Sequence, residues 1–300
     1  MGEETLLIVG NGFDLSMGFK TSYGDFMQSS FFPKSNSALC SYLWNEYREN
    51  MGWIDIENEL TKYSKQLDRF ELTPKIGKIQ IGEEVFREEY EELKSSLKNY
   101  LQEECKGSFC TRQGNPAKRV IDKLPADSKI ISFNYTNIIE RLTRDRFCTS
   151  KGNLLHIHGS LAPSDDIVFG VEDSAELSKE HVFLYKAHSR HLKVQEFSDW
   201  LNSAERIIFY GYSLGDTDRQ YFEKFFRKLC SSDSIYTELI FYYYGQASYD
   251  NLIWQLQVLT NHKLTQLLIQ NKIYRLLYVK RIKAVPSRKT WRRPLMVRQP

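Results

Sequence analysis

Long apolar segments are the first feature that this 300-residue sequence lacks. No run approaches the roughly 20 apolar residues that a membrane helix requires, so we expect no membrane span. The five cysteines are odd in number and show no framework spacing, which argues against a disulfide scaffold and a paired-cysteine zinc site. The N-terminus lacks the pattern of a signal peptide. We therefore expect a cytoplasmic protein with reduced thiols and no metal.

Acidic residues are absent from the last fifty positions, which hold 11 Lys or Arg. The other 250 residues hold 30 basic and 38 acidic side chains, so the net charge of +3 hides an uneven distribution. Residues 281–300 are rich in Pro and Arg and lack periodicity, which predicts a disordered basic tail. A nucleic-acid contact through phosphate neutralisation is one interpretation of this tail, and a solubilising end is the simpler one.

Short apolar runs alternate with helical stretches, which predicts an α/β protein with a Rossmann-like, mostly parallel sheet. The runs do not alternate between apolar and polar residues, so we expect burial on both faces. The expected strands are Thr5–Val9, Lys129–Phe133, Asn153–Ile157, Ile167–Gly170, Arg206–Tyr210, Glu238–Tyr243 and Tyr274–Val279.

Residues 38–105 differ, because their apolar residues recur at helical spacing, as in Phe86, Tyr90, Leu93 and Leu97. We expect an α-helical insertion after the first strand, with residues 1–37 and 106–280 forming the Rossmann-like domain. Within the insertion, Trp53 and Glu57 are four positions apart. We expect them to share one helical face as a packing pair.

The first expected strand runs into Gly10-Asn11-Gly12, half of a dinucleotide-binding fingerprint. Glycines permit a tight turn and allow the backbone to approach a phosphate, and a helix starting near Phe13 would direct its N–H groups at an anion. The third glycine of the full pattern is missing, since position 15 is Leu. An ordinary dehydrogenase is therefore disfavoured. Asp14 would repel a pyrophosphate unless it faces a ribose or caps the helix.

Three further polar motifs follow the ends of expected strands, and ligands bind at the carboxyl ends of strands in open α/β sheets. We therefore expect four turns to meet at one crevice. Asn134 as a helix cap, His158 as a structural histidine, and Ser213 or Asp216 as an N-cap are the plainer alternatives. The motifs are Asn134-Tyr135-Thr136, His156-Ile157-His158-Gly159-Ser160 and Gly211-Tyr212-Ser213-Leu214-Gly215-Asp216.

The set G-N-G-F-D, F-N-Y-T-N, H-I-H-G-S and G-Y-S-L-G-D resembles the AbiH family of bacterial phage abortive-infection proteins. The resemblance spans roughly residues 5–245 and includes the Trp53-x-x-x-Glu57 motif. That family is in turn similar to sirtuin-like proteins. Gly10-x-Gly12 corresponds to their glycine-rich NAD loop, Asn134 to their Asn-bearing motif, His158-Gly159 to their catalytic His-Gly, and Gly211–Leu214 to their ribose-contacting motif. The zinc module of true sirtuin deacylases is missing, so deacylation is not expected.

The resemblance implies phage defence, and the wider sirtuin-like group implies an NAD glycohydrolase with NAD as its substrate. Asn134 and His158 are the expected catalytic residues: Asn134 would orient the ribose and water, and His158 would act as general base at an ordinary pKa of about 6.5. The backbone N–H groups of residues 10–13 would bind the pyrophosphate. The residues expected to bind the nucleotide are Gly10, Asn11, Gly12, Phe13, Asp14, Tyr135, Thr136, Gly159, Gly211, Ser213, Leu214 and Asp216.

Two other functions stay open at this point. The first is an NAD- or ADP-ribose-binding sensor or interaction module that does not cleave its ligand. The second is a metal-dependent hydrolase or nuclease, with His156 and His158 on one strand face and Asp216 and Asp218 as added carboxylates. As partners we expect a phage-derived trigger or another defence protein, with a homo-oligomer left open.

Overall fold

The computed structural model describes residues 4–34, 37–68, 83–108, 114–144, 152–231, 236–271 and 273–278. Its centre is a six-stranded sheet in the order β3-β2-β1-β4-β5-β6, and every neighbouring pair of strands is parallel. This is the order of a doubly wound Rossmann-like fold, so the expected fold class is confirmed. The strands are β1 (Thr5–Val9), β2 (Lys129–Ser132), β3 (Leu154–His156), β4 (Arg206–Tyr210), β5 (Glu238–Tyr243) and β6 (Ile273–Tyr278).

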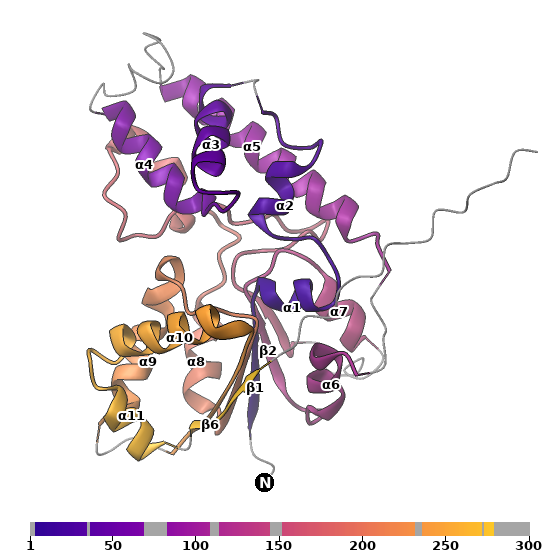
Figure 1. The fold of residues 1–300 in the computed structure, drawn as a ribbon, viewed down its shortest axis with the longest axis vertical. Coiled ribbons are helices and arrows are strands. Elements are labelled where there is room, and N and C mark those ends of the chain that lie inside the picture. The colour runs from indigo at the N-terminus through magenta and orange to yellow at the C-terminus, as the bar shows by residue number, and fades with distance from the viewer. Residues whose placement is uncertain are drawn as a thin grey trace, which may run out of the picture.

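Helices cover both faces of this sheet (Figure 1). On one face, Leu7 and Val9 of β1 pack against α1 (Asn11–Ser16), α6 (Pro116–Lys123) and α7 (Ile138–Thr143). On the other face, Leu6 and Ile8 pack in a core with α8 (Gln195–Ser203), α9 (Arg219–Leu229), α10 (Gly245–Leu259) and α11 (Leu264–Gln270). Alternate residues of β1 therefore enter different cores, which explains its continuous apolar sequence.

A helical lobe lies above the carboxyl edge of the sheet (Figure 1). It contains α2 (Tyr23–Gln28), α3 (Ala38–Glu49), α4 (Ile56–Asp68) and α5 (Glu83–Glu104). The buried residues Phe86, Tyr90, Leu93, Leu97 and Leu101 follow one face of α5, as the helical spacing predicts. Ser22 and Asp25 form a reciprocal capping box that fixes the start of α2.

The core of the helical lobe extends beyond the expected insertion of residues 38–105. It includes Phe26 and Phe32 on one side of that range and Ile167, Phe169 and Leu184 on the other. The lobe therefore combines an early segment of the chain with one that follows β3. Residues 281–300, the expected basic tail, lie outside the described residues.

Two expectations about local structure are wrong. Ile167–Gly170 is not a strand, because Ile167 and Phe169 enter the core of the helical lobe instead of pairing with the sheet. The carbonyl of Phe169 accepts a hydrogen bond from Tyr90, and Val168 N donates to His158 O over 2.7 Å. Trp53 does not share a helical face with Glu57, because α4 begins only at Ile56.

Candidate functional site

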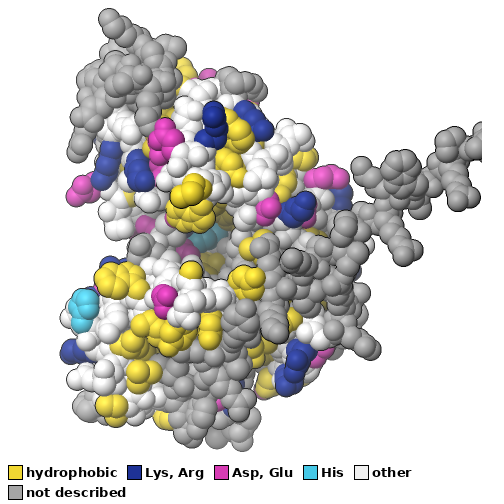
Figure 2. Space-filling model, viewed as in Figure 1, with side chains coloured by type: hydrophobic (Ala, Val, Ile, Leu, Met, Phe, Trp, Pro, Cys, Tyr) yellow, Lys and Arg dark blue, Asp and Glu magenta, His cyan; other side chains and the backbone are white. Residues whose placement is uncertain are grey.

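A pocket of about 480 Å³ lies between the carboxyl edge of the sheet and the helical lobe. Figure 2 shows it as a hollow between the two parts of the molecule. From the sheet side, residues after β1, β2, β3 and β4 line it, which is the convergence expected from the sequence. From the helical lobe come Thr21–Gly24, Gly52–Asp55, Glu57, Leu97 and Leu101.

The glycines of the first turn pack against the turn after β4. A Cβ on Gly12 would lie 2.6 Å from Gly211 Cα, and a Cβ on Gly211 would lie 2.3 Å from Phe13 N. Gly211 also has a φ of +62°, which L-residues with a Cβ rarely adopt. These glycines therefore allow two turns of the backbone to touch. This contact is sufficient to explain why both positions are glycine.

Of the four backbone N–H groups expected to bind a pyrophosphate, three already have acceptors in this conformation. Gly10 N donates to Tyr210 O over 3.2 Å, Gly12 N to Gly211 O over 2.9 Å, and Phe13 N to Gly10 O over 2.9 Å. Only the Asn11 N–H of this turn has no acceptor among the described residues. The helix that follows, α1, begins at Asn11 and spans six residues.

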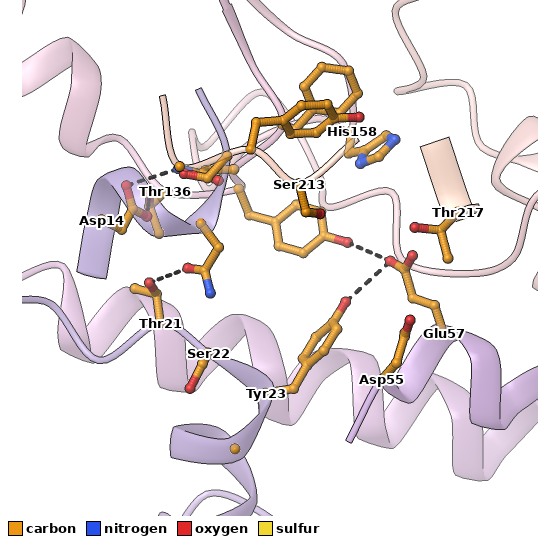
Figure 3. Close-up of a pocket in the computed structure, with 18 of the residues that line it drawn as sticks. Asp14, Thr21, Ser22, Tyr23, Asp55, Glu57, Thr136, His158, Ser213 and Thr217 are labelled. Carbon is orange, nitrogen blue, oxygen red and sulfur yellow. Dashed lines mark hydrogen bonds between the residues drawn. The ribbon is translucent and has the colours of Figure 1, made fainter. Parts of the chain in front are cut away.

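Asp14 is buried and holds together the turns after β1 and β2. Its Oδ1 accepts a hydrogen bond from Asn134 Nδ2 over 2.9 Å, and its Oδ2 accepts one from Thr136 Oγ1 over 2.5 Å (Figure 3). Burial raises the pKa of Asp14 to about 7, although these two hydrogen bonds act in the opposite direction. Asp14 is therefore an interior connector at the base of the pocket.

Asn134 does not cap the following helix, since α7 has Asn137 at its N-cap position. Its amide donates both to Asp14 and to Gly10 O, the latter over 3.1 Å. Both amide hydrogens are thus in use, and Oδ1 is the atom of Asn134 left for a ligand among the described residues. Thr136 and Tyr135 line the same pocket.

His158 is 5% exposed and lines the pocket next to a cluster of charged side chains. Its Nε2 lies 3.4 Å from Asp218 Oδ1 but has no hydrogen-bond partner among the described residues. Burial lowers the pKa of His158 to about 3, and the nearby Lys186 ammonium adds to this effect. The imidazole is therefore neutral near pH 7, and the expected ordinary pKa for His158 is wrong.

Lys186 is the centre of the charged cluster and is 2% exposed. Its Nζ lies 2.7 Å from Glu172 Oε1, 3.0 Å from Glu57 Oε2 and 3.4 Å from Asp218 Oδ1. Burial lowers its pKa, but the three carboxylates outweigh burial and hold the pKa of Lys186 well above its ordinary value. The ammonium is therefore charged and joins α4 of the helical lobe to η3 (Asp216–Asp218) of the sheet lobe.

Glu57 projects into the pocket from α4 (Figure 3). Its Oε1 accepts hydrogen bonds from Tyr23 over 3.2 Å and from Tyr135 over 3.3 Å. Burial raises the pKa of Glu57 to about 7, against the influence of Lys186. Glu57 is therefore partly protonated near neutral pH.

His156 and His158 do not form the metal pair of the alternative hydrolase or nuclease. The side chain of His156 contacts Asn134 O over 2.9 Å and Glu140 Oε1 over 2.8 Å. Among the described residues, the group with metal-ligand spacing is instead His158, Glu172 and Asp218, whose ligand atoms lie within 4.8 Å of one another. The Lys186 ammonium contacts both of these carboxylates.

The remaining predicted residues are not all at the pocket. Asn11 and Ser213 line it with Gly10 and Gly211, whereas Gly12 lines a second cavity of about 210 Å³ that shares Gly211, Tyr212 and Ser213. Phe13 and Leu214 are buried in the two cores of the sheet lobe. Gly159 has a φ of +66° and packs against Asp166 O. Asp216 begins η3, and its side chain lies outside the described part of the chain.

The family model for bacteriophage abortive infection AbiH matches residues 6–241. The chain belongs to the AbiH family. The resemblance stated from the sequence motifs is thereby confirmed for AbiH itself. No curated protein matches the chain. Membership of the AbiH family indicates a part in abortive infection by bacteriophage. All pocket residues lie within the matched segment, so the site belongs to the AbiH portion of the chain.

Sequence reasoning missed several residues of this AbiH pocket. Lys186 and Asp55 occur in no recognised motif, and Glu57 was interpreted as a packing residue. The Trp53-x-x-x-Glu57 pattern was the one signal for the helical-lobe side, because both residues line the pocket. No described helix combines the length and the apolar composition needed to cross a membrane.

Proposed function

We propose that this AbiH protein acts in phage defence by hydrolysing NAD to nicotinamide and ADP-ribose. The observation that carries the proposal is the pocket at the carboxyl edge of the Rossmann-like sheet, which Asn134 and neutral His158 line together with Glu57 and Asp218. Such an edge is where α/β folds of this type bind nucleotides.

The chemistry of the lining supports cleavage of the nicotinamide–ribose bond. The nicotinamide of NAD leaves as a neutral molecule, so the reaction does not require a strong general acid. The ribose develops positive charge in an oxocarbenium-like transition state, which nearby carboxylates such as Glu57 and Asp218 stabilise. Water attacks C1′ of the ribose and transfers its proton to the protein.

His158 and Asn134 orient the water in this scheme. A histidine with a pKa of about 3 is a weak base, so His158 accepts a hydrogen bond from the water and Asp218, 3.4 Å away, stabilises the imidazolium as the proton transfers. Oδ1 of Asn134 accepts a hydrogen bond from the ribose or the water.

The phosphates are assigned to the open end of the pocket. The N–H groups of Gly10, Gly12 and Phe13 are occupied, which leaves the Asn11 N–H and side-chain donors. Thr21 Oγ1 donates to Asn11 Oδ1 over 2.5 Å, and this contact turns the Asn11 amide hydrogens toward other acceptors. Asn11 and the exposed hydroxyl of Ser213 are the proposed phosphate contacts.

Turnover of NAD by the purified protein tests the proposed function. Purified protein incubated with NAD, with and without extract from phage-infected cells, is expected to release nicotinamide and ADP-ribose. Asn134→Ala and His158→Ala are each expected to lower the rate by about 10²–10⁴-fold, the usual contribution of a positioned proton-transfer group. Chromatography of both products measures the reaction. Glu176→Gln changes an exposed carboxylate and serves as the control.

No release of nicotinamide under any of these conditions would contradict the proposal, as would full turnover in both variants. The low basicity of His158 favours one alternative, a module that binds NAD or ADP-ribose without cleaving it. Calorimetry that detects binding, together with absence of product, would identify that case. Metal-dependent hydrolysis at His158, Glu172 and Asp218 is tested by metal analysis of the purified protein.

A further inference from the structure

Trp53 and Asp55 of the helical lobe have no part in the mechanism above, although both line the pocket beside Glu57. Trp53 is 70% exposed, which is unusual for a large aromatic side chain next to a polar pocket. Its position is fixed by the backbone: Gly52 N donates to Tyr47 O over 2.9 Å, and Trp53 N donates to Asn50 O over 3.1 Å.

The turn that carries Trp53 has an uncommon backbone conformation. Met51 and Gly52 have φ angles of +52° and +81°, and a non-glycine residue in this region is disfavoured by about 1 kcal/mol or more. An arrangement of this kind persists where the surrounding structure fixes it, and such positions cluster at ligand sites. Here the turn holds the indole at the pocket instead of in the core of the helical lobe.

Two acidic residues follow Trp53 within four positions of the chain. Asp55 and Glu57 both line the pocket (Figure 3). Asp55 Oδ1 accepts a hydrogen bond from Asn58 N over 3.3 Å, which fixes the side chain at the start of α4. Among the described lining residues, the carboxyl groups of Asp55, Glu57 and Asp218 stand against the one ammonium of Lys186, while Asp14 faces the protein interior. The pocket is therefore suited to a cation.

We propose that Trp53, Asp55 and Glu57 form a subsite for a positively charged aromatic ring. An indole face attracts cations through its quadrupole and also stacks on flat rings, and carboxylates nearby neutralise the charge. The inference rests on the proposed function and deepens it, since the nicotinamide ring of oxidised NAD has this chemistry. The neutral ring of reduced NAD lacks the charge.

The experiment compares two probes of nearly equal shape, 1-methylnicotinamide, which is a cation, and nicotinamide, which is neutral. Binding is measured by calorimetry and by quenching of tryptophan fluorescence. We expect the cation to bind at least tenfold more tightly. Trp53→Ala is expected to weaken the cation at least tenfold and to remove the quenching, and Trp53→Phe to retain part of the affinity.

Trp254→Ala is the matched control, because Trp254 is also exposed, at 62%, and lies on α10 outside both cavities. It is expected to leave binding unchanged. Glu57→Gln is expected to reduce the preference for the cation. Because Trp53 is exposed, its replacement leaves the cores intact, and thermal unfolding verifies this for each variant.

Equal affinity for the two probes would overturn the inference, as would unchanged cation binding in Trp53→Ala. Binding of the cation tests the subsite, and turnover of NAD tests the hydrolase, so the two proposals can be distinguished. Cation binding that depends on Trp53, in a protein that does not cleave NAD, supports the subsite and contradicts the hydrolase. NAD cleavage with an unchanged KM in Trp53→Ala supports the hydrolase and contradicts the subsite.

Discussion

Asp14 shows how one residue can look misplaced in the sequence and yet be necessary in the fold. Next to a glycine turn it suggested repulsion of a phosphate. In the structure it is 1% exposed and accepts hydrogen bonds from Asn134 and Thr136, so it faces the protein interior. The turn after β1 and the turn after β2 are therefore joined through a carboxyl group.

The raised pKa of Asp14 predicts a dependence of stability on pH. The folded protein retains this proton up to a pH of about 7, whereas the unfolded chain loses it near the ordinary value of 3.8. The folded state binds more protons between these values, so its stabilisation is complete below pH 3.8 and is lost as the pH rises toward 7. Asp14→Asn removes the titration.

We therefore expect the free energy of unfolding of the wild type, minus that of Asp14→Asn, to fall as the pH rises from 4 to 7. The slope is at most about 1.4 kcal/mol per pH unit. Urea unfolding at several pH values measures it, and Asp122→Asn on the exposed side of α6 is the control. A difference that stays constant over this range would refute the assignment.

The sequence predicted the pocket residues that belong to motifs and missed those that depend on distant parts of the chain. Asn134, His158 and Ser213 follow strands, so their shared edge could be inferred from parallel pairing alone. Lys186 lies in η2 (Lys186–His188), within a long irregular segment, and contacts Glu57 only because that segment folds back on the helical lobe. No local pattern encodes such a contact.

At the scale of elements, two turns contact each other at the site. The turn after β1 and the turn after β4 approach so closely that neither Gly12 nor Gly211 has room for a Cβ. Because β1 and β4 are adjacent parallel strands, their turns leave the sheet side by side. The small size of glycine lets both turns line one pocket.

Gly211→Ala tests this packing, with Gly245→Ala as a matched control. Gly245 has a φ of +75° but no atom within 4 Å of its Cβ position, so alanine there adds backbone strain alone, about 1–2 kcal/mol. Gly211→Ala adds a steric clash that costs about 1–3 kcal/mol more. Denaturant unfolding compares the two variants. An equal loss of stability in both would show that the turns separate at little cost.

The sequence predicted several strands correctly from their short apolar runs. It also predicted a strand where the apolar residues are buried in a core made by helices. The sequence indicated β1, β4 and β5 with their observed bounds. Ile167–Gly170 has the composition of a strand, but its side chains enter a core made by helices. Burial on several sides produces the same apolar sequence in both settings, and the composition alone does not distinguish them.

At the scale of the whole molecule, Lys186 connects two lobes with separate cores. It contacts Glu57 on α4, Glu172, and Asp218 at the end of η3. Lys186→Met would leave these carboxylates buried without a cation, and we expect a loss of about 3–5 kcal/mol in the free energy of unfolding. Lys193→Met removes a partly exposed ammonium from Asp165, which keeps its contacts with His191 and Ser160, and is expected to cost less than about 1 kcal/mol.

Denaturant unfolding of both variants measures the difference. Adding Glu57→Gln to Lys186→Met should restore part of the lost stability, because one uncompensated charge is removed. A loss at Lys186 no larger than that at Lys193 would mean that the cluster does not hold the lobes together.

The sequence predicted the class of the fold but not its assembly. Parallel strands and a helical insertion follow from composition and spacing. The order of the strands does not, because it depends on which side of β1 each later strand joins. The segment after β3 packs into the helical lobe, and this too depends on contacts between distant parts of the chain.

The central position of β1 also affects how this protein is made on the ribosome. β1 is synthesised before the other five strands of this sheet, but one of its two neighbours is β4, so pairing along that edge waits until Tyr210 has emerged. Ser213, Thr217 and Asp218 of the pocket follow still later. A nascent or prematurely terminated chain that stops before β4 lacks this wall. For an abortive-infection protein, a fragment of this kind cannot assemble the site inside the host that produces it.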